Sequence, residues 1–148
     1  MDYKAYKHTT VDYMKTQAKI SELLRRFEIY DTRWTNLADQ VIFEFNKKIE
    51  LDGQERLAGV RIIIQGANDK NRNQLNRALF YYLKSKMEFL EFGFIEFLQE
   101  FMPHLILIGK NGRSVTAYQL FKPQYEKSLI THKGAGEVKM LPDLNKED

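Results

Sequence analysis

In the first half of the chain, three segments separated by turns have the patterns of strands. The three segments are residues 30–35, residues 40–46 (QVIFEFN) and residues 57–66 (LAGVRIIIQG). The first two alternate apolar and polar side chains, and the third is dense in β-branched residues. Alternation with a period of two is typical of half-buried strands, and strands joined by short turns pair most simply as antiparallel neighbours. Asp52 and Gly53 form a dipeptide that adopts positive φ angles at little cost, which suits the last turn. The sequence therefore predicts a three-stranded antiparallel meander.

Apolar residues at helical spacing flank this meander on both sides. Before it, such spacing predicts a helix over residues 10–27, with Thr9 and Thr10 at its start. After it, Asn68 or Asp69 can cap a long helix whose apolar seam follows a 3-4 spacing. The members of the seam are Phe80, Leu83, Met87, Leu90, Phe94, Phe97 and Phe101. Gly93 either ends one helix and begins another, or is tolerated within a single helix.

The last third of the chain carries a hairpin signal. Residues 105–108 and 114–120 flank an Asn-Gly pair, which favours a type I′ turn between two strands. A short helix is expected over residues 123–131, and residues 133–148 form a flexible link and tail. The fold class is therefore α+β: helix, three-stranded meander, long helix, then a hairpin and a short helix. Residues 1–132 form a single domain.

Composition excludes several classes of protein. The chain of 148 residues has no cysteine, so disulfides, thiolate metal sites and cysteine nucleophiles are absent. The apolar stretch 78–109 contains six charged side chains, which rules it out as a membrane span. The three histidines have no metal-ligand spacing, and no phosphate-binding glycine loop occurs. We therefore expect no enzyme, no cofactor and no metal, and a cytoplasmic location because the first residues lack an apolar signal sequence.

Charge is divided unevenly along the long helix. Residues 69–86 hold five bases and one acid, whereas residues 87–102 hold four acids and no base. This polarity opposes the helix dipole, which favours acids at the start and bases at the end. Two explanations remain open. The charges pair internally, for example Lys84 with Glu88 at i,i+4, or the basic start captures an anion.

The net charge of +3 and the pI near 9.0 permit an anionic partner. Our first hypothesis is that nucleic-acid phosphates bind at the basic start of the long helix, helped by bases elsewhere. The residues predicted for this contact are Lys70, Arg72, Asn73, Arg77, Lys47, Lys48 and Arg113. The alternative is a protein-binding module that docks through the acidic helix end or the tail. The residues predicted for that contact are Glu96, Glu100, Met140, Leu141 and Leu144. The seam from Phe80 to Phe101 is a possible homo-oligomer contact.

Two resemblances bear on these hypotheses. The expected order of elements over residues 10–92 resembles double-stranded-RNA-binding domains, whose basic second helix corresponds to Lys70, Arg72 and Arg77. The segments 101–103 (FMP) and 112–115 (GRSV), together with the TTV start and the late Leu-Pro, are similar to a family of small phage and prophage proteins. The second resemblance implies a phage-encoded protein in the host cytoplasm and implies no particular reaction.

Overall fold

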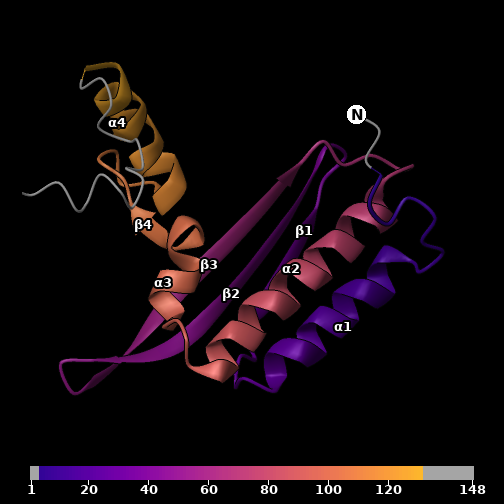
Figure 1. Ribbon diagram of the computed structural model, residues 1–148, viewed down its shortest axis with the longest axis horizontal. Helices are drawn as coiled ribbons and strands as arrows, with labels where there is room; N and C mark the ends of the chain where they lie inside the picture. Colours follow the sequence, from indigo (N-terminus) through magenta and orange to yellow (C-terminus); the bar gives the residue numbers. More distant parts are fainter. Residues whose placement is uncertain (1–3, 132–148) are drawn as a thin grey trace, which may run out of the picture.

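A three-stranded antiparallel sheet with two helices on one face forms the centre of the fold (Figure 1). The computed structural model describes residues 4–131. The strands β1 (Thr32–Asn36), β2 (Gln40–Leu51) and β3 (Gln54–Gln65) lie in the order β1-β2-β3. The helices α1 (Tyr13–Arg25) and α2 (Arg72–Phe92) run side by side across them. The predicted α+β class and the predicted meander are both confirmed.

Register explains which side chains enter the core. Phe43 of β2 lies opposite Trp34 of β1 and Ile62 of β3, so these three residues share the face that the helices cover. Burial of that face removes apolar surface from water, which is the main stabilising contribution to the fold. The core residues come from α1, β2, β3, α2, α3 and the segment after α1, and the partly buried Trp34 of β1 packs against them. The core residues are Ile20, Leu23, Leu24, Ile29, Phe43, Phe45, Val60, Ile62, Leu79, Leu83, Met87 and Phe101.

The turn at Asp52 and Gly53 is confirmed. Both residues have positive φ, 53° and 70°, and they connect a strand pair that begins with Leu51 opposite Gln54. This is the two-residue turn whose twist matches the twist of the flanking strands.

The starts of both long helices differ from the prediction. Helix α1 begins at Tyr13 because Asp12, rather than Thr9 or Thr10, caps it by accepting a hydrogen bond from Met14 N at 3.0 Å. Helix α2 begins at Arg72, because the Asn68 side chain instead accepts hydrogen bonds from the backbone of the turn before the helix.

The apolar seam does not follow one continuous helix. Gly93 ends α2 in the left-handed conformation, with φ of 73°, and a short helix α3 (Phe97–Phe101) follows. Leu83, Met87 and Phe101 are buried in the core as the seam predicts, but Phe94 in the connecting loop is 73% exposed. The interpretation that Gly93 separates two helices is therefore the correct one.

The C-terminal part begins with a 3-10 turn (Met102–His104) and the hairpin of β4 (Ile106–Ile108) and β5 (Ser114–Thr116). The hairpin is confirmed, but its turn is not type I′, because Asn111 does not have the positive φ that type I′ requires. Only Gly112 of the pair has positive φ, 75°, and the loop closes through Gly109 N to Arg113 O at 2.8 Å.

Helix α4 (Ala117–Thr131) starts where a strand was predicted to continue to Leu120. The cause is a reciprocal cap: Gln119 N donates to Thr116 Oγ1 at 3.3 Å, and Thr116 N donates to Gln119 Oε1 at 3.0 Å. These two bonds satisfy backbone donors at the start of the helix. Pro123, expected at a helix start, lies inside α4. Within residues 4–131 no helix combines the length and apolar character needed to cross a membrane.

Candidate nucleic-acid interface

Arg72, the first residue of α2, is buried and not free to contact a phosphate. Its Nη2 atom donates to Leu37 O in the turn between β1 and β2, and its guanidinium carbon lies 5.6 Å from the centre of the Tyr13 ring. Its Nη1 atom is also buried and makes no hydrogen bond. The arginine therefore joins the start of α2 to α1 and to the sheet.

Asn73 and its neighbours have a similar structural role. Asn73 Oδ1 accepts a hydrogen bond from Tyr13 N at 2.8 Å, at the first residue of α1. Gln17 Nε2 donates to Asn36 Oδ1 at 2.9 Å and to Asn76 Oδ1 at 3.0 Å. Side-chain amides that hydrogen-bond to one another inside a protein favour a single arrangement of the helices and strands that carry them. This network fixes the starts of α1 and α2 beside the end of β1.

Arg77 lies one turn further along α2, among aromatic rings. Its guanidinium carbon is 5.4 Å from the centre of the Phe80 ring and 5.1 Å from that of Tyr81. Tyr6 also stacks on Tyr81, with ring centres 5.2 Å apart. Lys70 is exposed in the turn before the helix. Of the bases predicted at the start of α2, Arg77 therefore adjoins an aromatic surface and Lys70 faces solvent.

The other predicted bases lie elsewhere. Lys47 Nζ donates to Phe27 O at 3.0 Å, just beyond the end of α1, whereas Arg72 lies at the start of α1. These two sites are separated by roughly the length of a 13-residue helix, about 20 Å. Lys48 pairs with Glu55 at 3.4 Å on the surface, and Arg113 is exposed in the β4–β5 loop. The seven residues predicted for phosphate contact do not form one surface.

A basic groove between α1 and α2 was missed from the sequence. Its volume is about 370 Å³, and it is lined by Lys19, Glu22, Leu23, Arg26, Phe80 and Lys84. Three of these side chains are cations and one is an acid. Among the described residues no ion pair involves Lys19 or Arg26, and Lys84 makes only a long contact of 3.7 Å with Glu88. The predicted pairing of Lys84 with Glu88 is thus confirmed, and it leaves Lys84 47% exposed.

The groove adjoins Arg77 through a shared ring. Phe80 lines the groove and also carries the Arg77 guanidinium on its face. Lys19 and Arg26 are seven residues apart, a spacing that places them on one side of α1. That spacing was the only signal in the sequence. It could not reveal Lys84 as a neighbour, because the contact depends on how α1 and α2 pack.

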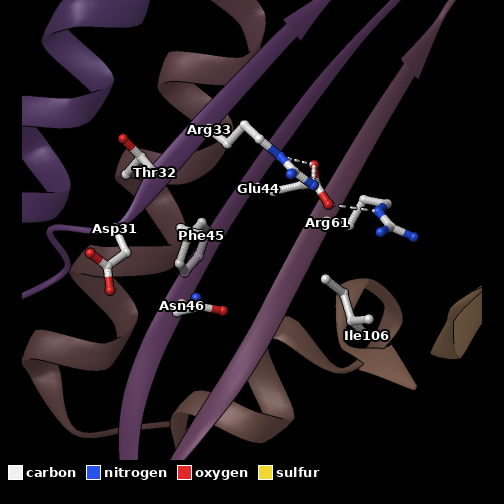
Figure 2. Close-up of a pocket in the computed structure, with 8 residues that line it drawn as sticks. All are labelled: Asp31, Thr32, Arg33, Glu44, Phe45, Asn46, Arg61 and Ile106. Carbon is white, nitrogen blue, oxygen red and sulfur yellow. Dashed lines mark hydrogen bonds and ion pairs between the residues drawn. The ribbon is translucent and has the colours of Figure 1, made fainter. Parts of the chain in front are cut away.

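The opposite face of the sheet carries a second charged cluster, shown in Figure 2. Glu44 lies between two arginines: its Oε1 atom accepts from Arg33 Nη2 at 2.7 Å, and its Oε2 atom accepts from Arg61 Nε at 3.0 Å. The three residues are direct neighbours across β1, β2 and β3. They line an open hollow of about 450 Å³. Arg61 is further held by Ser114, which ties the C-terminal hairpin to the sheet.

Burial raises the pKa of the Glu44 carboxyl, but the hydrogen bonds and charges of Arg33 and Arg61 outweigh it, so the pKa lies below its usual 4.5. An acid whose pKa is lower in the folded state stabilises the fold above its unfolded pKa and loses this effect as pH falls. We therefore expect Glu44→Gln to lower the free energy of unfolding at neutral pH. The difference in the free energy of unfolding between wild type and variant should become smaller when urea unfolding is repeated from about pH 6 down to about pH 3.

The control for this experiment is Glu55→Gln, which removes an acid from a surface pair that is 69% exposed on both sides. Its effect should be small and nearly constant with pH. If the loss of unfolding free energy in Glu44→Gln stays constant over the same pH range, the lowered pKa of Glu44 is contradicted.

The residues predicted for protein docking are also separated. The Glu100 side chain is 11% exposed, and its Oε1 atom accepts a hydrogen bond from Lys86 Nζ at 2.9 Å. It is therefore occupied inside the fold, whereas Glu96 is exposed at the start of α3. Met140, Leu141 and Leu144 lie outside the described residues.

Residues 4–131 contain no group of three or more His, Asp or Glu side chains arranged to hold a metal ion. Comparisons with protein-family models, with curated proteins and with solved structures found no match to this chain.

Proposed function

We propose that this chain is a non-catalytic nucleic-acid-binding protein that contacts phosphates through the groove between α1 and α2. The observation that supports this proposal is the meeting of Lys19, Arg26 and Lys84 around one hollow that contains a single acid, Glu22. Bases gathered along a groove neutralise phosphates and release counterions, which provides most of the affinity in non-specific binding.

The rings beside the groove extend the same argument. Phe80 lines it, and the stacked pair of Tyr6 and Tyr81 lies next to it under Arg77. Aromatic rings next to a basic groove are the arrangement that proteins use to hold single-stranded bases. We therefore propose single-stranded DNA or RNA as the preferred partner, bound without strong dependence on sequence. Arg77 is the one residue from our first hypothesis that keeps a direct role.

The proposal is tested by titrating labelled single- and double-stranded oligonucleotides at several salt concentrations. We expect the double variant Lys19→Ala/Arg26→Ala to bind single strands at least about tenfold more weakly at low salt. The slope of log affinity against log salt should fall by roughly 1.4, because each phosphate contact on a single strand contributes about 0.7. Both side chains are exposed, so the fold should not change.

The matched control is Lys48→Ala/Arg113→Ala, which removes the same charge from exposed positions outside the groove. It should bind nearly as well as the wild type. No binding by the wild type even at low salt would refute the proposal. Equal losses in the two double variants would show that net charge, rather than the groove, attracts the nucleic acid.

A further inference from the structure

Within residues 4–131, little of the chain packs against helix α4. It projects away from the sheet, and of its residues only Ala117 at its first position is buried (Figure 1). An isolated helix of this length is only marginally stable in water. Pro123 weakens it further, because proline lacks the N–H that would bond to Gln119 O. A partner that covers α4 would supply the missing stabilisation.

The exposed side of α4 is apolar, and the segment from the β4–β5 loop to the end of α4 has a net positive charge. Tyr118, Phe121, Tyr125 and Leu129 follow one another at steps of three and four, so they lie on one side of the helix. They are 57%, 57%, 58% and 45% exposed. Between residue 108 and the end of α4 there are four bases and one acid, namely Lys110, Arg113, Lys122, Lys127 and Glu126. Lys122 pairs with Glu126 at 2.6 Å, so the net charge of +3 comes from Lys110, Arg113 and Lys127. We call this surface the α4 face.

A second exposed aromatic surface has the opposite charge. Phe92 at the end of α2 and Phe94 in the following loop are 70% and 73% exposed, and their rings stack 5.5 Å apart. Phe89, which is 45% exposed, precedes them by one turn of helix. Glu88, Glu91 and Glu96 are close to these rings in sequence, and residues 87–102 contain no base. Glu88 pairs with Lys84 at 3.7 Å, so Glu91 and Glu96 carry the negative charge of this surface. We call this surface the acidic end of α2.

We propose that the α4 face of one copy of this chain binds the acidic end of α2 of a second copy. Both surfaces are rich in exposed rings, and their charges are complementary. A contact between two α4 faces would instead set bases against bases, which is unfavourable. This assembly does not use the groove between α1 and α2 and does not depend on nucleic-acid binding.

The two surfaces lie apart on the same molecule, so the contact joins copies head to tail (Figure 1). Each copy then keeps one free surface of each kind, and assembly continues into a ring or a filament. The exposed apolar side chains of both surfaces together amount to on the order of 1,000 Å². That area is at the low end for specific interfaces, so assembly should depend on protein concentration, and its charged part should weaken with salt.

Head-to-tail contact is tested with two variants of the full chain. One carries Phe121→Asp/Tyr125→Asp in the α4 face, and the other carries Phe92→Arg/Phe94→Arg in the acidic end of α2. All four side chains are more than half exposed, so both variants should fold, which circular dichroism checks. Sedimentation and light scattering should show wild-type mass rising with concentration, and each variant alone should remain a monomer.

The decisive sample is an equal mixture of the two variants. The first keeps an intact acidic end and the second keeps an intact α4 face, so the mixture should form a complex with the mass of two chains and no larger. A mixture that stays monomeric while the wild type assembles would overturn the proposal. A wild type that stays monomeric at all concentrations would also overturn it.

Discussion

Replacing Glu100 by alanine is expected to lower the free energy of unfolding by about 3 kcal/mol, measured by urea denaturation. Lys86 and Glu100 are 13% and 11% exposed and lie 2.9 Å apart. The Lys86 ammonium is 4.6 Å from the centre of the Tyr82 ring, and its remaining oxygen partner is the Glu100 carbonyl, at 2.9 Å. Removing the carboxylate therefore leaves a largely buried cation without a counter-charge, which is costly in a medium of low polarity.

Two controls separate this explanation from a simple loss of contacts. Lys86→Met combined with Glu100→Leu removes both charges and should recover most of the lost stability, because apolar side chains replace a buried pair at little cost. Lys84→Ala breaks the exposed pair with Glu88 on the same helix and should cost no more than about 0.5 kcal/mol. If Glu100→Ala and Lys84→Ala lower the free energy of unfolding by similar amounts, burial of the Lys86–Glu100 pair does not explain the effect of Glu100→Ala.

Phe43→Ala should also be strongly destabilising, by about 3–5 kcal/mol, because it removes a large ring from a packed core. Phe43 has no exposed surface, and its ring stacks on Trp34 with centres 4.1 Å apart. The cavity left behind would lie between the sheet and both helices, where close packing leaves little room for collapse. Thermal and urea unfolding followed by Trp34 fluorescence would measure the loss.

The matched control for this experiment is Phe92→Ala, which removes the same ring from a position that is 70% exposed. It should change the free energy of unfolding by no more than about 0.5 kcal/mol when measured on dilute, monomeric protein. A loss for Phe92→Ala as large as that for Phe43→Ala would contradict the assignment of the core to the helix-covered face of the sheet.

The meander and its buried face could be predicted because alternation identifies both. Val41, Phe43 and Phe45 lie two residues apart, and all three are buried. The start of α4 could not be predicted by the same reasoning, because the strand over residues 114–120 was predicted from the Asn-Gly pair before it and not from alternation. Thr116 is followed three residues later by Gln119, a spacing that favours a helix start. The two hydrogen bonds between these residues start α4 where the strand was predicted to continue.

Periodicity also failed where the backbone changes direction. The 3-4 spacing of the seam continues through Gly93, because spacing records side-chain type and contains no information on φ. The positive φ of Gly93 turns the chain and leaves Phe94 in solvent. Spacing therefore predicted the buried residues before the glycine and failed immediately after it.

The candidate site was harder to predict than the fold, because its partners are distant in sequence. A count of charges places Arg72 in a basic segment, but it cannot show that the Leu37 carbonyl, 35 residues earlier, binds this arginine. In the same way, Lys19 and Lys84 line one groove only because α1 and α2 pack in parallel. Tertiary packing buried one predicted contact residue and created a different basic surface.

The hairpin of β2 and β3 extends well past its neighbours. β1 pairs with β2 only as far as Phe45, while β2 and β3 remain paired to Leu51 and Gln54. The turn at Asp52 and Gly53 therefore lies at the tip of an arm that extends away from α2 and α4 (Figure 1). Loop tips of this kind tolerate insertions. The arm thus offers a position for a reporter peptide or for new chain termini, so that binding and assembly can be followed without altering either surface.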